Sequence, residues 1–146
     1  KANLNDLVER VIALVEFEAK VHDKSIFKSL ASDLQPVYTD PIQVQQVFLN
    51  ILNNAMEALE KHGKIVVKTW AEDGRVAISF SDNGRGIPRG NLDKIFTPFF
   101  TTKPPGKGTG LGLSICYGII EKLNGKIDVR SDPGKGTTFT IHLPTK

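Results

Sequence analysis

Two asparagines four residues apart are the first side chains in the sequence whose type and spacing suit chemistry. Asn50 and Asn54 lie within a helical pattern, and residues four apart on a helix share one face. They fall at the edge of the apolar stripe of that helix, where an amide oxygen is placed to bind a hard cation such as Mg²⁺. Amides that cap the rim of a core have the same spacing, so the pair alone leaves both interpretations open.

A carboxylate at the end of a predicted strand is the second candidate. Side chains alternate along a strand, so Asp82 falls on the same apolar face as Ile78 and Phe80. A carboxylate that faces the core needs a hydrogen-bond donor, and the amino group of a purine is one such donor. Gly84 and Gly86 would let the backbone lie close to a flat ligand, although a plain Asp-Asn-Gly turn has the same composition.

Thr137 joins this group from the last predicted strand. It shares the apolar face of that strand with Phe139 and Ile141, so its hydroxyl enters the same layer as Asp82. A β-branched strand residue without any ligand is the alternative interpretation.

A glycine-rich segment, residues 106–113, leads into the start of a predicted helix. Free backbone N–H groups and the positive end of the helix dipole form an anion site at such a start. The segment matches neither the Walker loop nor the dinucleotide-binding fingerprint. Lys103 and Lys107 lie nearby in the sequence and would meet phosphate charge, although two lysines in a loop are often only solvated.

Three phenylalanines, Phe96, Phe99 and Phe100, lie in the long stretch between Asp82 and Gly110. The stretch contains six Gly and four Pro, and a connection this long within one domain is usually functional or mobile. The three rings either anchor the loop to the domain or form a docking surface.

These candidate residues need helices and a sheet to position them. Helical periodicity runs from Leu4 to Val15, a second helix runs from the N-cap Asp40 to Gly63, and a third spans about residues 110–123. Strands cluster and helices cluster, which favours an α+β fold. We expect a two-layer sandwich with a mixed, mostly antiparallel sheet of about five strands packed on three helices. Short strands are predicted over residues 25–30, 36–39, 64–71, 75–81, 126–131 and 137–143, with a hairpin turn at Asp73-Gly74.

The composition is that of one globular domain. The chain has 146 residues, and its net charge of +3 is too small to indicate a nucleic-acid partner. Cys116 is the one cysteine, which excludes an internal disulfide and a thiolate zinc cluster and fits a reducing, cytoplasmic compartment. No apolar run approaches the length that crosses a bilayer, so we expect no membrane segment in this chain, whether or not its parent is membrane-anchored.

Five motifs follow one another along the chain: Asn50-x-x-x-Asn54-Ala55, Asp82-x-Gly84-x-Gly86-Ile87, Phe96-x-x-Phe99-Phe100, Gly108-Thr109-Gly110-Leu111-Gly112-Leu113 and Gly134-x-Gly136-Thr137-x-Phe139. Their order and spacing resemble the N, G1, F, G2 and G3 boxes of the catalytic, ATP-binding domain of sensor histidine kinases. The nitrogen-regulation type is the most similar. This family belongs to the superfamily of DNA gyrase, the mismatch-repair ATPases and a heat-shock chaperone.

The resemblance implies a role for each matched residue. Asp82 accepts a hydrogen bond from the adenine amino group, with Thr137 assisting through water. Asn54 ligates Mg²⁺ and Asn50 supports it, so these two are the predicted catalytic residues. A mobile ATP lid covers the nucleotide over about residues 87–109. The predicted nucleotide-binding residues are Asn54, Asp82, Gly84, Gly86, Ile87, Phe96, Lys103, Lys107, Gly108, Thr109, Gly110, Leu111, Gly112, Leu113 and Thr137.

Two positions depart from the family pattern. Many histidine kinases carry a lysine three residues after the metal-binding asparagine, where this chain has Glu57. The phosphate charge must then be met by Lys61, Arg85, Lys103 or Lys107. The hydrolases of the superfamily carry a glutamate four residues before that asparagine as the base for water, and this chain has Asn50, whose amide cannot take a proton.

The three histidines complete the functional prediction. His22, His62 and His142 lie in no helical pattern suited to a phosphate acceptor, so we expect one monomeric domain over residues 1–146 that lacks the acceptor-histidine dimerisation domain. The resemblance implies binding of Mg·ATP and donation of the γ-phosphoryl group to a histidine on that separate domain. A response regulator receiver domain acts downstream in that family. A nucleotide-binding regulatory module without catalysis and an ATPase of the superfamily are the alternatives.

Overall fold

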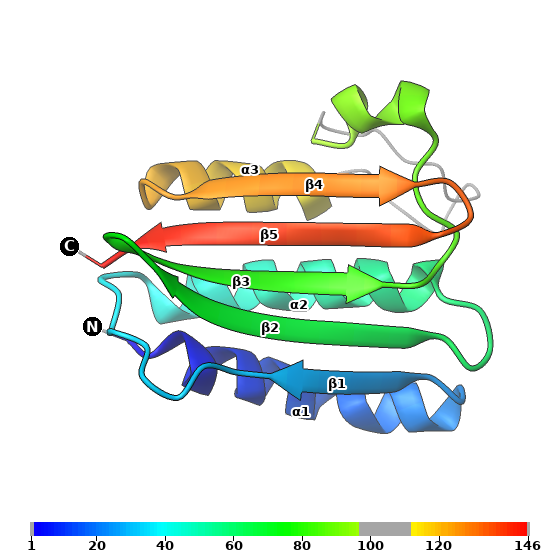
Figure 1. Ribbon diagram of the computed structural model, residues 1–146, viewed down its shortest axis with the longest axis horizontal. Coiled ribbons are helices and arrows are strands. Elements are labelled where there is room, and N and C mark those ends of the chain that lie inside the picture. The colour runs from blue at the N-terminus through cyan, green and yellow to red at the C-terminus, as the bar shows by residue number, and fades with distance from the viewer. Residues whose placement is uncertain (1, 97–111, 146) are drawn as a thin grey trace.

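Over residues 2–96 and 112–145, which the computed structural model describes, five strands and three α-helices form two layers (Figure 1). The strand order is β1-β2-β3-β5-β4; β1 pairs with β2 in parallel and every other pair is antiparallel. The predicted α+β sandwich with a mixed, mostly antiparallel sheet is confirmed. The elements are α1 (Leu4–Val21), β1 (Ser25–Ser29), α2 (Pro41–Ala58), β2 (Lys64–Glu72), β3 (Arg75–Asp82), the 3-10 helix η1 (Arg89–Lys94), α3 (Gly112–Lys122), β4 (Lys126–Asp132) and β5 (Gly136–Pro144).

The core lies between the sheet and the three helices on one of its faces (Figure 1). The N-cap of α2 is the predicted one, because the Asp40 carboxylate accepts from the backbone N–H groups of Ile42 and Gln43. The apolar stripe of α2 is buried against the central strand β3, where the rings of Phe48 and Phe80 lie 5.5 Å apart. This contact holds α2 under the end of β3, which carries Asp82.

Both of the first two helices end at other places than the sequence pattern predicts. Helix α1 continues past Val15 to Val21, because Ala19 still lies on its buried face. Helix α2 ends at Ala58 rather than at Gly63, so the prediction for that end is wrong. The backbone turns extended at Leu59, whose side chain is buried in the core, and the chain then leaves the helix axis before it reaches the glycine.

The predicted strand at residues 36–39 is also wrong. Only Val37 is paired there, in an isolated bridge with Ala2 near the start of the chain. Pro36 beside it has no N–H to donate, which limits the ladder to one residue pair. No helix in the described parts of the chain is long and apolar enough to cross a membrane.

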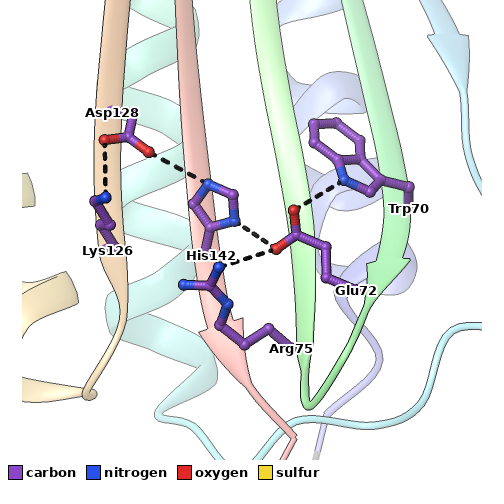
Figure 2. Close-up of polar contacts among 6 residues, drawn as sticks. All are labelled: Trp70, Glu72, Arg75, Lys126, Asp128 and His142. Atoms are coloured by element: carbon purple, nitrogen blue, oxygen red, sulfur yellow. Dashed lines mark hydrogen bonds and ion pairs between the residues drawn. The ribbon is translucent and has the colours of Figure 1, made fainter.

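His142 lies between two carboxylates on the sheet face that points away from the helices (Figure 2). Its Nδ1 lies 2.7 Å from Glu72 Oε1 of β2, and its Nε2 lies 3.4 Å from Asp128 Oδ2 of β4. Trp70 Nε1 donates to the other Glu72 oxygen, at 3.2 Å. The hydrogen bond with His142 holds the pKa of Glu72 below its ordinary value of 4.5, against the opposing effect of burial. The histidine therefore has a structural role, in agreement with the sequence, which offers it no catalytic partner.

We expect the stability of the chain to depend on pH through Glu72. Its pKa is lowered on folding, so its contribution is present above the unfolded value and is lost as pH falls through the folded value. The variant Glu72→Gln should therefore be less stable than the parent near pH 7, and the difference should shrink below about pH 4.5. Urea unfolding of both chains between about pH 7 and about pH 3.5 measures this difference. The exposed change Asp33→Asn is the control for loss of one charge, and a Glu72→Gln deficit that stays constant into acid would contradict the prediction.

Candidate functional site

Asp82 lies at the end of β3 with its side chain on the helix side of the sheet. Its Oδ1 accepts from the backbone N–H of Gly84 at 2.9 Å. Its neighbour across the β3–β5 pair is Thr137, which is buried and faces the same side. The structure thus brings together the carboxylate and the hydroxyl that the strand patterns place in one layer, although the two residues are far apart in the sequence.

The environment of Asp82 is that of a partly desolvated acceptor. Burial raises the pKa of its carboxyl above the ordinary 3.8, while the backbone N–H groups of Gly84 and Thr137 and the charge of Arg85 act in the opposite direction. A carboxylate removed from water in this way gains from a further N–H donor, since an unmet acceptor in a low-dielectric site is costly. An exocyclic amino group is such a donor.

The loop after Asp82 is fixed by hydrogen bonds to three other elements. Lys64 N–H donates to the Asn83 side-chain oxygen at 2.8 Å, and Arg85 N–H donates to the carbonyl of Ala58, the last residue of α2, at 3.2 Å. Gly134 N–H donates to the Arg85 carbonyl at 2.7 Å. The site therefore has a rigid wall on this side, built from α2, β2 and the β4–β5 turn.

Gly84 and Gly86 are needed for contacts within the protein. A Cβ on Gly84 would lie 2.5 Å from the carbonyl oxygen of Ala58, and a Cβ on Gly86 would lie 2.2 Å from that of Asp132. Gly86 also has a φ of +75°, which favours glycine. The sequence predicts glycines here that let the backbone lie close to a ligand; the close approach that the structure displays is to the protein's own backbone.

Asn50 and Asn54 lie half-buried on one face of α2, at the rim of the core, as the helical spacing predicts. The Asn50 amide donates to the Sγ of Cys116 on α3 at 3.7 Å. That thiol donates to the Val47 carbonyl at 3.8 Å, and burial raises its pKa to about 11, so it stays protonated. Cys116 is therefore a packing residue that fixes the orientation of Asn50, and no nucleophile.

Phe96 packs against Tyr117 of α3 and Phe139 of β5. The Phe96 ring lies 5.3 Å from that of Tyr117 and 6.5 Å from that of Phe139, so it anchors the start of the predicted lid to the core. Leu113, in the first turn of α3, also packs against the core. The remaining predicted positions of this part, which are Phe99, Phe100, Lys103, Lys107, Gly108, Thr109, Gly110 and Leu111, lie outside the described residues, as does most of the predicted lid.

Two of the four cations that the sequence offers in place of the usual family lysine are close together. Lys61 and Arg85 line one pocket of about 370 Å³ beyond the end of α2. The Lys61 ammonium also lies 3.7 Å from the carboxylate of Asp23. The other residues that line this pocket are Glu60, His62, Gly63, Asn83, Gly84 and Gly134.

One residue outside the predicted site, Ser131, lies against Thr137. Ser131 is the register partner of Thr137 on β4, and its hydroxyl lies 2.9 Å from the Thr137 hydroxyl. The predicted turn at Pro133–Gly136 would pair Asp132 with Thr137 and Ser131 with Thr138. The structure instead pairs Asp132 with Gly136, which brings Ser131 opposite Thr137. No pattern in the sequence marks a serine at a strand end as functional.

The donor set suits magnesium rather than a transition metal. Among the residues that the structure describes, no group of three or more His, Cys, Asp or Glu side chains could hold a metal ion. The half-buried Asn54 amide on α2 is a single hard oxygen donor. Mg²⁺ usually takes one or two protein oxygens and fills its remaining positions with water and substrate phosphates, so such a site fits it.

The described residues form an α+β domain in which a carboxylate and a hydroxyl lie at one end of two central strands, beside a helix that carries two asparagines. The chain belongs to the family of histidine kinase-, DNA gyrase B- and HSP90-like ATPases, whose sequence profile matches residues 39–146. The resemblance drawn from the five motifs is thereby confirmed.

The chain is similar to several histidine kinases in sequence and in structure. The sensor histidine kinase ZraS of Escherichia coli (strain K12) is 40% identical over 142 residues, which are 97% of this chain and 30% of ZraS. The nucleotide-free catalytic domain of histidine kinase ThkA superposes with a TM-score of 0.88 at 35% identity, covering 98% of this chain and 93% of that one. Full-length ShkA in complex with AMPPNP gives a TM-score of 0.88 at 28% identity, over 98% of this chain and 30% of ShkA. The chain therefore has the fold of a histidine kinase catalytic domain and spans less than a third of ZraS.

Proposed function

We propose that this domain binds Mg·ATP and donates the γ-phosphoryl group to a histidine on a separate dimerisation domain, in two-component signal transduction. The observation that carries the proposal is the pairing of the half-buried Asp82, at the end of β3, with the buried Thr137, at the start of β5, within a domain of the histidine kinase ATPase family. A carboxylate and a hydroxyl in this position suit the amino edge of adenine.

The phosphate end of the nucleotide would lie over α2 and the start of α3. Asn54 supplies an amide oxygen to the metal, and Asn50, whose orientation is fixed by Cys116, supports it. Mg²⁺, when bound, neutralises charge on the phosphates. The family resemblance implies that the glycine-rich segment 108–112 would offer backbone N–H groups to the phosphates and that the residues from about 87 to 109 would close over the nucleotide as a lid.

The residue at position 50 favours transfer over hydrolysis. Phosphoryl transfer depends mainly on positioning and charge neutralisation, so the domain does not need a base of its own when the acceptor is an imidazole. Hydrolysis needs a group that takes a proton from water, and the amide of Asn50 cannot do so. We infer that the acceptor domain supplies the nucleophile and that a response regulator receiver domain takes the phosphoryl group afterwards. Both steps belong to the cytoplasm.

The test is phosphotransfer between separate polypeptides. The chain is incubated with Mg·ATP labelled at the γ-phosphate, alone and together with the dimerisation domain of the same protein. We expect label on the added domain, stable to alkali and lost in acid as a phosphoimidazole is, and negligible label on the chain itself. The change Ser81→Ala, on the opposite face of the sheet, should leave the transfer unchanged, whereas Asp82→Asn should greatly reduce it.

Two other outcomes correspond to the alternative functions. ATP binding without any label on the added domain would overturn the proposal in favour of a nucleotide-binding regulatory module. Rapid release of inorganic phosphate by the chain alone would overturn it in favour of an ATPase of the same family. Label on His22, His62 or His142 at a useful rate would contradict the requirement for a separate acceptor.

A further inference from the structure

Three polar side chains form a row across one end of the sheet face that covers the core. Asp82 on β3 is the register partner of Thr137 on β5, and Thr137 is the register partner of Ser131 on β4. Ser131 follows Ile127 and Val129 on the side of β4 that faces the helices. The row therefore continues the proposed adenine-binding pair by one further strand.

The Ser131 hydroxyl has three protein partners at short distances. It accepts from the backbone N–H of Ile87 at 2.7 Å, lies 2.9 Å from the Thr137 hydroxyl, and donates to the Gly136 carbonyl at 3.0 Å. A hydroxyl has one proton and two lone pairs, so these three contacts use its full capacity. Ser131 therefore has no proton or lone pair available for a ligand. It can affect binding only through the groups to which it is hydrogen-bonded.

The proton count fixes the direction of the bond to Thr137. The Ile87 amide is only a donor and the Gly136 carbonyl only an acceptor, so the single Ser131 proton goes to Gly136. The Thr137 hydroxyl must then donate its own proton to Ser131. Thr137 is left with lone pairs alone on the ligand side, and it becomes an acceptor like its neighbour Asp82.

We propose that Ser131 is a positioning residue which holds the Thr137 hydroxyl as an acceptor and thereby makes the site select 6-amino over 6-oxo purines. The inference rests on the proposed function and adds to it a determinant of base specificity. A 6-amino group donates to two acceptors in a row, either directly or through an ordered water. A 6-oxo group would place its oxygen lone pairs against those of Asp82 and Thr137, and this repulsion disfavours its binding.

The same hydroxyl fixes the first residue of the predicted lid. The backbone N–H of Ile87 donates to the Ser131 hydroxyl. Two residues earlier, the Arg85 carbonyl accepts from the Gly134 N–H at 2.7 Å. Both bonds join the loop after β3 to the β4–β5 hairpin, one at strand β4 and the other at the turn. Loss of the serine hydroxyl therefore frees one backbone amide at a defined position, which gives a readout that does not depend on nucleotide.

The experiment measures selectivity by calorimetric titration of the chain with ADP and with inosine diphosphate, which differ at the purine 6-position. In Ser131→Ala the Thr137 proton is free to turn toward a 6-oxo group, and we expect the ratio of the two dissociation constants to fall roughly fivefold to tenfold. Ser131→Thr keeps the hydroxyl and should restore the ratio. Ser81→Ala removes a hydroxyl that pairs with Thr138 at 2.9 Å on the opposite sheet face, and it should leave the ratio unchanged.

Hydrogen exchange of the Ile87 amide separates this inference from the proposed function. We expect its protection to fall in Ser131→Ala and to remain in Ser81→Ala. ADP binding by Ser131→Ala with the parent ratio would overturn the role of Ser131 and leave the proposed function intact. Failure of the parent chain to bind either nucleotide would overturn both. If Ser131→Ala does not fold, Ser131→Cys, which keeps the size but bonds weakly, takes its place in the same titration.

Discussion

Replacement of Asp82 by asparagine is expected to weaken ADP binding about 10- to 100-fold. The carboxylate has two oxygens, of which Oδ1 accepts from the Gly84 N–H at 2.9 Å. An asparagine side chain has only one oxygen. If that oxygen keeps the bond to Gly84, the amide NH₂ meets the amino group of adenine, and donor faces donor. If the amide turns over, the Gly84 N–H loses its acceptor inside a partly buried site.

A calorimetric titration with ADP, with and without Mg²⁺, measures this loss. Asp132→Asn is the matched control, because it makes the same change of charge and shape at the exposed end of β4. Binding of ADP by Asp82→Asn with the affinity of the parent would exclude Asp82 from adenine recognition. An equal loss of affinity in both variants would show that the loss comes from the change in net charge and not from adenine recognition by Asp82.

The pH dependence of binding gives an internal check on the same residue. Burial raises the pKa of Asp82 above 3.8, so the free site takes up a proton at a higher pH than an ordinary aspartate does. The protonated carboxyl has lost one acceptor, and the affinity for ADP should fall as pH falls through that raised value. In Asp82→Asn this acid-side fall should be absent.

Replacement of Gly136 by alanine is expected to destabilise the chain by on the order of 3–5 kcal/mol. Gly136 has a φ of +124°, a region that L side chains rarely adopt. A Cβ at this position would lie 2.0 Å from the carbonyl oxygen of Asp82 and 3.0 Å from the Cα of Asn83. Both atoms are backbone, so the contact is relieved only if β3 and β5 separate at the end that carries Asp82 and Thr137.

Gly134→Ala separates the two contributions to this effect. Gly134 also has a positive φ, +79°, but a Cβ there would meet no atom within 4 Å. Its replacement introduces backbone strain without a collision and should cost about 1–2 kcal/mol. Urea unfolding followed by circular dichroism gives both values, and equal losses would show that strain alone explains the requirement for glycine at position 136. A typical domain is stable by only about 5–15 kcal/mol, so Gly136→Ala should remove a large part of the total.

Local sequence determined the elements and the faces that carry the site. The N-cap and apolar spacing of α2 fix its start and its buried face, because capping and helical periodicity act over a few residues. Strand alternation places Asp82 on the face of Ile78 and Phe80 for the same reason, and that placement is confirmed. The turn at Asp73-Gly74 fixes the β2–β3 pair.

Tertiary structure decided which of these faces meet. That β5 pairs with β3 in the register that joins Asp82 to Thr137 depends on contacts between distant segments, which no local pattern encodes. The end of α2 at Ala58 also depends on distant contacts, since the side chain of Leu59 is buried in the core and the Ala58 carbonyl accepts from the backbone N–H of Arg85. Ser131 has no local signature, since its role comes from three groups that only the folded sheet brings within 3.0 Å of one hydroxyl.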